Sequence, residues 1–291
     1  MTITGGVDVG AGTVKGVLLE DGRGLLSIHR LHTGALPARS GEQVLQHLLD
    51  DAGIAREQIG YLVATGFGRT QLKDRDLQVT DITCNGRGAI FLYPGTHSIL
   101  DMGAQTTRGI RVDGRGKVAR FKLNDRCAAG SGRFIERVAR TLEMDIETVV
   151  TNALQGDNPT TISSVCAVLG ESEVINHLAT GHRIEDILMG LHLSIGERAV
   201  MLLRQVRAEP EITLTGGMVN NEAMVRALRK LLDLPINVHP HGEYAAAIGA
   251  ALLAKHRYDR VQSGIPTPED GILGRNVASD ATTETGGTHC E

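Results

Sequence analysis

Short hydrophobic runs separated by glycine-rich turns dominate the first part of the chain. Such runs are typical of buried β-strands, whereas hydrophobic residues spaced three or four apart are typical of helices. These rules predict, in order, a strand over Val7–Val9, a hairpin of Val14–Leu19 and Leu25–His29 around Asp21–Gly24, a helix over Glu42–Asp51, a strand over Gly60–Ala64 and a helix over Cys84–Leu92.

The rest of the chain restarts with a strand over Ser98–Met102 and then becomes mostly helical. Helical spacing relates two groups of hydrophobic residues, first Phe134, Ile135, Val138 and Leu142, and then Ile184, Leu188, Leu191, Ile195, Ala199, Leu202 and Val206. The last predicted elements are a strand over Glu211–Thr215, a helix over Asn221–Leu232 and a small-residue helix over Glu243–Lys255. From Ser263 onward the aperiodic, polar composition predicts a disordered tail.

The segment 7–29 returns in modified form as the segment 100–121. With an offset of 93 residues the matching pairs are Asp8 and Asp101, Gly10 and Gly103, Ala11 and Ala104, Thr13 and Thr106, Lys15 and Arg108, and Gly16 and Gly109. Solenoid repeats have periods of only about 20–50 residues. The repetition therefore predicts two related domains, at 1–97 and 98–262, followed by the tail at 263–291.

Each copy of the repeat ends a buried strand with an aspartate two residues before a glycine. The glycine lets backbone N–H groups approach phosphate oxygens, and the carboxylate holds Mg²⁺, commonly through water. We predict that Asp8 and Asp101 are catalytic, and that Gln105 orients an attacking water. The residues expected to contact phosphate are Gly10, Ala11, Gly12, Thr13, Lys15, Gly103, Ala104 and Thr106. A plain turn after a strand is the alternative explanation for either copy taken alone.

Composition narrows the classes of function. The 291-residue chain is 41% hydrophobic and 22% charged, and its net charge is −4. It has no Trp, four Tyr and four Phe, which together with the negative charge argues against nucleic-acid binding. The sequence contains neither a membrane-spanning run nor a secretory signal, so we expect a cytoplasmic protein with reduced cysteines.

Three motifs resemble those of the actin, sugar-kinase and heat-shock ATPase superfamily. VDVGAGTVKGVLLE is similar to its first phosphate motif, LDMGAQTTRGIRV to its second and LTGGMVNNEAM to its adenosine motif. The helices at Cys84–Leu92 and Glu243–Lys255 resemble its two connecting helices. The resemblance implies an α/β fold of duplicated, ribonuclease H-like domains with ATP in the interdomain cleft. It also implies that adenosine lies against Gly216 and Gly217.

Two of the four cysteines stand in similar settings. Cys127 and Cys166 each follow a polar or extended stretch and precede an amphipathic helix, where the helix dipole favours a thiolate. Cys84 lies in a predicted packing helix and Cys290 in the tail. A [4Fe–4S] cluster takes four thiolates, so two per chain indicate a cluster shared between subunits. Core packing, or a shared Cys₄ zinc site, would also account for two such cysteines.

The sequence motifs around these two cysteines favour the iron–sulfur cluster. NDRCAAGSGRF and SSVCAVLGESEVI resemble motifs of the BadF/BadG/BcrA/BcrD-type ATPase family, which comprises activators of 2-hydroxyacyl-CoA dehydratases and ATP-binding subunits of benzoyl-CoA reductase. The resemblance implies that Cys127 and Cys166 are the metal ligands of one bridging [4Fe–4S] cluster. It also implies electron transfer from ferredoxin to substrate-binding reductase or dehydratase subunits.

Departures from the family pattern bear on its branches. Ala11-Gly12 stand where relatives often have hydroxyl residues, and Gln105-Thr106 where dehydratase activators typically have Gln-Asp. DNPTTISSVCAVL and the tail resemble the shorter ATP-binding subunit of benzoyl-CoA reductase, which pairs with a homologous ATPase subunit. We therefore expect a role in the dearomatisation of benzoyl-CoA. The alternatives are a homodimeric dehydratase activator and a small-molecule kinase of the same fold.

Overall fold

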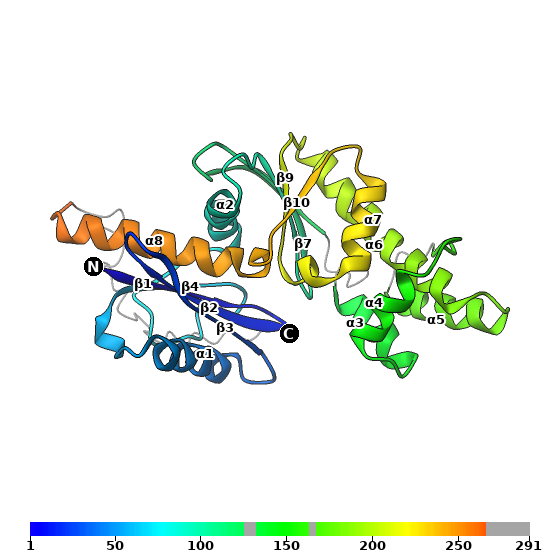
Figure 1. Cartoon of the computed structure of the whole chain (residues 1–291), viewed down its shortest axis with the longest axis horizontal. Helices are drawn as coiled ribbons and strands as arrows, with labels where there is room; N and C mark the ends of the chain where they lie inside the picture. The colour runs from blue at the N-terminus through cyan, green and yellow to red at the C-terminus, as the bar shows by residue number, and fades with distance from the viewer. Residues whose placement is uncertain (125–131, 163–166, 266–291) are drawn as a thin grey trace, which may run out of the picture.

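The computed structural model describes residues 1–124, 132–162 and 167–265 and contains two five-stranded sheets with the same topology (Figure 1). The first sheet has the order β3-β2-β1-β4-β5 and consists of β1 (Ile3–Val9), β2 (Thr13–Glu20), β3 (Gly24–His32), β4 (Ile59–Thr65) and β5 (Leu77–Gln78). The second has the order β10-β9-β6-β7-β8 and consists of β6 (Ser98–Met102), β7 (Thr107–Val112), β8 (Val118–Leu123), β9 (Ile212–Thr215) and β10 (Ile236–Val238). The duplicated sequence therefore corresponds to a duplicated sheet.

The register of the central hairpins repeats as well. In both sheets the first three strands pair antiparallel, and the fourth pairs parallel with the first. Asp8 of β1 lies opposite Lys15 of β2, and Asp101 of β6 lies opposite Arg108 of β7. Each aspartate therefore has a cation as its cross-strand neighbour, at the end of the strand where the phosphate-type turn begins.

Helices cover both faces of the first sheet. The amphipathic helix α1 (Pro37–Ala52) buries Val44 and Leu48 against one face. On the other face α8 (Ala245–Gln262) places Ala247 and Ile248 against Val17. Because α8 follows the second sheet in the chain, the predicted boundary at residue 98 assigns it to the second domain, yet the sheet that it packs against is the first.

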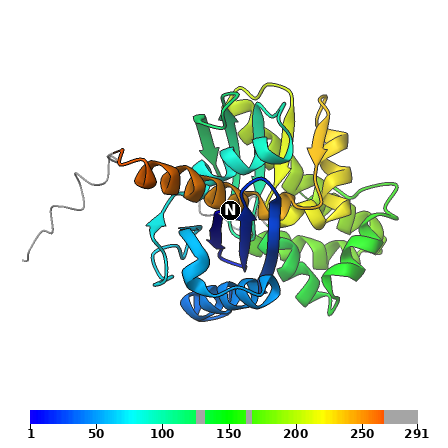
Figure 2. The same ribbon diagram turned by 60° about the vertical axis from the view of Figure 1, so that its left-hand side comes forward.

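A second connecting helix, α2 (Asp81–Leu92), lies beside α8 and packs against the second sheet through Ala89. Figures 1 and 2 show α2 and α8 side by side between the two sheets. They approach closely at Gly249, where an added Cβ would lie 1.8 Å from the carbonyl oxygen of Cys84. The two lobes therefore join through a crossed helix pair without side-chain bulk at this contact.

The second lobe carries a large helical insertion between β8 and β9. It comprises α3 (Gly132–Thr141), α4 (Ile146–Ala153), α5 (Ala167–Ala179) and α6 (Ile184–Gln205), with α6 and α7 (Glu222–Leu231) covering one face of the second sheet. The corresponding connection of the first lobe holds α1 and the short 3-10 helix η1 (Arg56–Gln58). Cys127 and Cys166 belong to this insertion but lie outside the described residues, as do Cys290 and the predicted tail from residue 266 onward.

Several element boundaries differ from the sequence-based expectation. Helix α2 begins at Asp81 rather than Cys84, with an acidic residue in its first turn where the helix dipole favours it. Helix α8 continues to Gln262 rather than ending at Lys255, and Lys255 pairs with Asp259 one turn later. Strands β5 and β10 were not expected, because two or three residues are too few to form a hydrophobic pattern.

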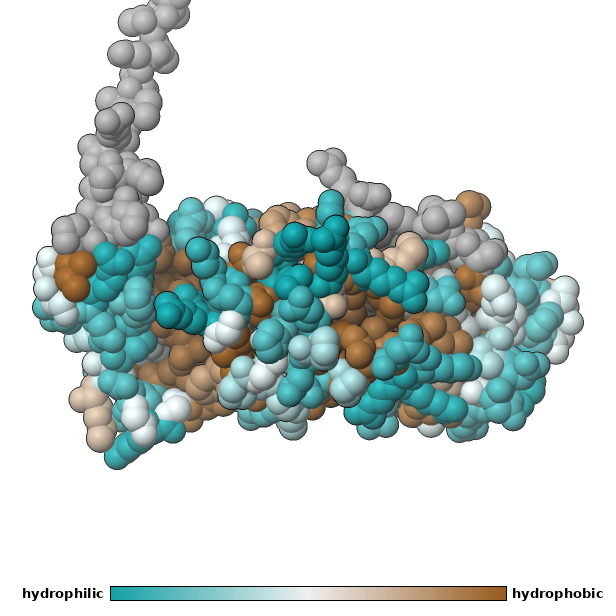
Figure 3. All heavy atoms as spheres, turned by 90° about the horizontal axis from the view of Figure 1, so that it is seen from above, coloured by the Kyte–Doolittle hydropathy of each residue, from teal (hydrophilic) through white to brown (hydrophobic). Residues whose placement is uncertain are grey.

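The surface seen in Figure 3 is mostly hydrophilic, with hydrophobic residues showing between the polar ones. Within the described residues, no helix combines the length and the hydrophobicity needed to cross a bilayer.

Two short 3-10 helices, η3 (Gly217–Asn220) and η4 (Gly242–Tyr244), complete the second lobe near the junction with α8.

Candidate nucleotide site

A pocket of about 380 Å³ opens where the two repeated turns meet. All of the predicted phosphate, catalytic and adenosine residues line it, namely Asp8, Gly10, Ala11, Gly12, Thr13, Lys15, Asp101, Gly103, Ala104, Gln105, Thr106, Gly216 and Gly217. The fold therefore gathers residues from separate strand ends of both lobes around one cavity.

The two turns face each other directly. A Cβ added to Gly12 of the first turn would lie 2.7 Å from the Cβ of Ala104 in the second. Each turn is braced from within its own lobe: the Thr33 hydroxyl donates to the Gly10 carbonyl at 2.7 Å, and the Gly103 N–H donates to the Thr106 carbonyl at 2.9 Å. A polyphosphate between such turns would be held from both lobes.

The carboxylate of Asp8 is buried beside a buried lysine. Lys15 Nζ lies 3.9 Å from Asp8 Oδ2, so the two form an ion pair without a close hydrogen bond. Burial raises the pKa of Asp8 to about 6; Lys15 opposes this shift, while the carboxylates of Asp81 and Asp101 add to it. A buried carboxylate that its lysine compensates only in part favours a further cation, which is what a Mg²⁺–phosphate site supplies.

The carboxylate of Asp101 is held more tightly. Arg108 donates to it through Nη1 at 2.7 Å and reaches Asp81 through Nη2 at 2.6 Å. Burial works against the charge of Arg108, but Asp101 and Asp81 together raise the pKa of its guanidinium. The Thr215 hydroxyl donates to the other oxygen of Asp101 at 3.2 Å. Arg108 therefore ties the second turn to the first residue of the connecting helix α2.

A glycine with positive φ stands beside each aspartate. Gly66 (φ 87°) follows β4 and Gly216 (φ 83°) follows β9, the equivalent strands of the two sheets. A Cβ at Gly66 would lie 2.3 Å from Asp8 Oδ1, and one at Gly216 would lie 2.9 Å from Asp101 Oδ1. Both positions thus combine a backbone conformation that favours glycine with space that only glycine leaves free.

Several lining residues were not anticipated from the sequence. Glu243 is buried just before α8 and accepts from Arg30 Nη1 at 3.1 Å and from Asn220 Nδ2 at 2.8 Å, which links the two lobes at the mouth of the pocket. Asp81 also lines the pocket, and the late predicted start of its helix concealed it. The available signal was an acidic residue at the start of one predicted helix, Glu243, and another just before the start of a second, Asp81.

The sequence predicts a Mg²⁺ site at the aspartates of the pocket and a separate metal centre at two cysteines. Among residues 1–124, 132–162 and 167–265, no cluster of three or more His, Cys, Asp or Glu side chains is placed to hold a metal ion. Mg²⁺ fits nonetheless, because it usually takes one or two protein carboxylates, completed by phosphate and water, and Asp8 and Asp101 line one cavity.

Of the four cysteines, Cys84 lies in a helix as predicted, and the other three lie outside the described residues. Cys84 is fully buried in α2, and burial raises the pKa of its thiol to about 12, so it stays protonated. Cys166 immediately precedes α5, and α3 begins five residues after Cys127. Arg137 of α3 donates to Glu171 of α5, which joins these two helices. A [4Fe–4S] cluster completed by a second subunit stays a prediction.

Fold and pocket together define a two-lobed ATPase of the duplicated, ribonuclease H-like type, with nucleotide between the lobes. A model of the BadF/BadG/BcrA/BcrD ATPase family matches residues 6–254, and the chain belongs to this family. Both the predicted fold class and the predicted family are thereby confirmed.

Similar proteins come from two branches. An activator of lactoyl-CoA dehydratase from Anaerotignum propionicum is 38% identical over 250 residues, covering 86% of this chain and 96% of that protein. A benzoyl-CoA reductase subunit from Thauera aromatica is 36% identical over 272 residues, covering 90% and 96%.

Solved structures agree on the fold. The activator of the 2-hydroxyisocaproyl-CoA dehydratase from Clostridium difficile with bound ADPNP superimposes with a TM-score of 0.85 at 33% identity, covering 91% of this chain and 99% of that one. A ROK family glucokinase from Streptomyces griseus, at 14% identity and a TM-score of 0.54 over 87% and 99% of the two chains, shares the fold alone.

Proposed function

We propose that this chain is the ATP-hydrolysing subunit of a low-potential electron-transfer system and serves a benzoyl-CoA reductase. The observation that carries the proposal is the pocket in which both aspartate turns and the Gly216-Gly217 turn converge. Opposed turns of this kind hold the two ends of a triphosphate from different lobes, so cleavage of its terminal bond releases one lobe from the other.

The residues divide the hydrolysis between them. Asp8 and Asp101 would hold Mg²⁺, and the backbone of Gly10–Thr13 and Gly103–Thr106 would cradle the phosphates. Gln105, exposed at the pocket, orients the water that attacks the terminal phosphorus as the bond to the bridging oxygen breaks. The ion pair between Lys15 and Asp8 is long, so Lys15 can leave Asp8 for the phosphates. There it neutralises the negative charge that develops on the phosphate oxygens during hydrolysis.

Movement at the second turn has a direct route to the cysteine-bearing insertion. The N–H groups of Gly132 and Arg133 donate to the carbonyls of Gly103 and Ala104, at 3.1 and 2.9 Å. Helix α3 is thus hydrogen-bonded to the phosphate turn at one end and tied to α5 through Arg137 and Glu171. When bound, a [4Fe–4S] cluster held by Cys127, Cys166 and two thiolates of a second subunit would supply a one-electron carrier.

The electron donor proposed is a reduced ferredoxin, which loses one electron for each electron gained by the catalytic partner. Similarity to the Thauera aromatica benzoyl-CoA reductase subunit extends over 272 residues, and together with the DNPTTISSVCAVL stretch it supports that branch and a heterodimer with a homologous ATPase subunit. The second candidate is a homodimeric dehydratase activator, which the 38% identity to a lactoyl-CoA dehydratase activator favours.

Anoxic purification tests the proposal. The full chain, isolated with its co-purifying subunits, should be brown and contain about four irons per pair of ATPase subunits. Cys127→Ser and Cys166→Ser should each lose the iron and the ATP-dependent reduction, whereas Cys84→Ser, at the buried cysteine of α2, should keep both. Iron-free wild type after anoxic reconstitution would overturn the proposal. ATP-dependent reduction of benzoyl-CoA, against dehydration of a 2-hydroxyacyl-CoA, decides between the two branches.

A further inference from the structure

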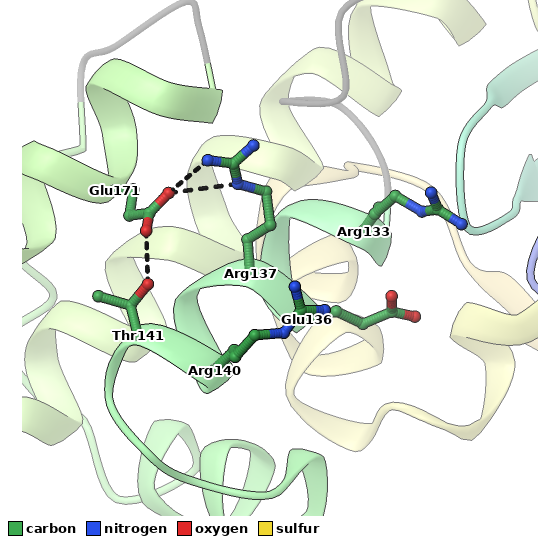
Figure 4. A pocket seen from close by; sticks show the side chains of 6 residues that line it. All are labelled: Arg133, Glu136, Arg137, Arg140, Thr141 and Glu171. Carbon is green, nitrogen blue, oxygen red and sulfur yellow. Dashed lines mark hydrogen bonds and ion pairs between the residues drawn. The ribbon is translucent and has the colours of Figure 1, made fainter.

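Helix α3 presents three arginines on the side away from its hydrophobic residues. Arg133, Arg137 and Arg140 line a pocket of about 550 Å³ together with Glu136, Thr141 and Glu171 (Figure 4). The opposite side of the helix is buried in the core of the second lobe through Phe134, Ile135, Val138 and Ala139. The arginine side is therefore a fixed surface, because the buried side holds the helix in place.

Only one of the three guanidinium groups is neutralised within the described part of the chain. Arg137 donates to Glu171 Oε2 at 2.7 and 3.2 Å, and the Thr141 hydroxyl donates to the other oxygen of the same carboxylate. Arg133 and Arg140 are exposed and form no ion pair with any described carboxylate. In Figure 4, Arg133 and Glu136 point away from Glu171.

Part of this charge stabilises the helix, because Glu136 is spaced three residues from Arg133 and four from Arg140, and Arg140 lies in the last turn, but the three arginines also oppose one another. Arginines at positions i, i+4 and i+7 repel one another along one helix face. The chain as a whole carries a net charge of −4, so a cluster of three arginines differs in sign from the chain's net charge. Arginine binds carboxylates in a planar, two-pronged geometry, and the Arg137 guanidinium already holds the Glu171 carboxylate with two of its nitrogens inside this pocket.

Helix α3 also contacts the nucleotide pocket. Its first two N–H groups bind the carbonyls of the second phosphate turn, and Glu136 lines both the nucleotide pocket and the arginine pocket. A shift of Gly103 and Ala104 on ATP hydrolysis would therefore move Arg133 and Arg140 with the helix.

We propose that the arginine face of α3 (Arg133, Arg137 and Arg140) docks an acidic segment of the catalytic partner protein, and that the nucleotide state of the second turn controls this docking. The inference rests on the proposed function, since it assumes a catalytic partner. Two unpaired guanidinium groups beside an arginine–carboxylate pair form a surface that a run of Asp or Glu side chains would complete.

A peptide titration tests the surface without the partner. Full-length protein should bind fluorescein-labelled hexaglutamate with a salt-sensitive affinity and should not bind hexaglutamine. The double variant R133E/R140E should bind hexaglutamate about tenfold or more weakly. The matched variant R39E/K73E reverses two exposed cations of the first lobe that make no ion pair within the described residues, and it should bind like the wild type.

Three results would overturn the proposal. The first is equal hexaglutamate binding by the wild type and R133E/R140E. The second is binding of inorganic phosphate that R133E/R140E abolishes, while hexaglutamate fails to bind the wild type, which would make it a small-anion site. The third is an affinity that is the same with ADP as with a non-hydrolysable ATP analogue, which would remove the control by the second turn.

Coupled turnover with the native catalytic subunits separates this inference from the proposed function. R133E/R140E changes side chains and retains the backbone N–H of residue 133 that bonds the second turn, so it should keep its ATPase rate but reduce substrate about tenfold more slowly, with a weaker dependence on salt. A wild type that hydrolyses ATP without electron transfer would overturn the proposed function, and the peptide titration alone then decides the surface. A coupled wild type matched by R133E/R140E would overturn the docking surface alone.

Discussion

The two phosphate turns share a strand, a register and a glycine-flanked aspartate, but they treat their cations differently. Lys15 lies 3.9 Å from Asp8 and has no second carboxylate, whereas Arg108 spans Asp101 and Asp81 at 2.7 and 2.6 Å within the described part of the chain. A lysine in a long ion pair is able to leave it for a phosphate, while an arginine that bridges two carboxylates stays where it is. The first turn therefore supplies a cation that can move to a phosphate, and the second turn anchors the connecting helix α2.

The largest expected effect is on stability at the anchored turn. Arg108→Met leaves Asp101 and Asp81 without their shared cation and should lower the free energy of unfolding by about 3–5 kcal/mol. Lys15→Met should cost only about 1 kcal/mol at pH 7, because Asp8 with its raised pKa takes up a proton instead. Urea unfolding of both variants measures the difference. Equal losses would show that the two turns are not divided in this way.

Asp8→Asn should stabilise the nucleotide-free protein at high pH. The folded-state pKa of Asp8 is about 6 against 3.8 in the unfolded chain, so the folded state binds more protons between these values and loses stability as pH rises through them. The amide removes this loss, which amounts to about 3 kcal/mol at pH 8 and falls toward zero near pH 4.

Unfolding of the wild type and Asp8→Asn across this pH range, without Mg²⁺ or nucleotide, measures the effect. Asp74→Asn serves as a control, since it removes a carboxylate of the first lobe that is not among the charges acting on the pKa of Asp8. A difference between wild type and Asp8→Asn that does not grow with pH would mean that the Asp8 carboxylate is already compensated in the empty protein.

The rate of ATP hydrolysis should also distinguish Lys15 from Arg108. Lys15→Met should lower the ATPase kcat about 10²-fold, the usual effect of removing one charge that stabilises a transition state. Arg108→Lys keeps a cation between Asp101 and Asp81 and should change kcat only a few-fold. Steady-state phosphate release measures both, and a larger loss in Arg108→Lys than in Lys15→Met would reverse the assignment of the two turns.

The sequence alone was enough to predict the duplicated turns, but not the contacts of the helices that link the two lobes. Matching Asp8 with Asp101 anticipated the common turn, because a repeated strand, turn and hairpin keeps its register. The contact of α8 with the first sheet depends on small residues meeting over a long sequence distance, as at Gly249 and Cys84, and no local pattern records that. The role of Asp81 was hidden by the polar first turn of α2.

The smallest effect expected concerns that hidden residue. Asp81→Asn removes one of the two carboxylates on Arg108 but leaves Asp101 in place, so stability should fall by only about 1 kcal/mol. The exposed pair of Arg56 and Asp74 is the matched comparison, and Asp74→Asn should cost less because solvent screens that pair. Urea unfolding compares the two variants. A loss in Asp81→Asn as large as that in Arg108→Met would mean that the tie to α2, rather than the hold on Asp101, is the main task of the arginine. The second turn would then serve chiefly to connect the nucleotide pocket with the helix pair between the lobes.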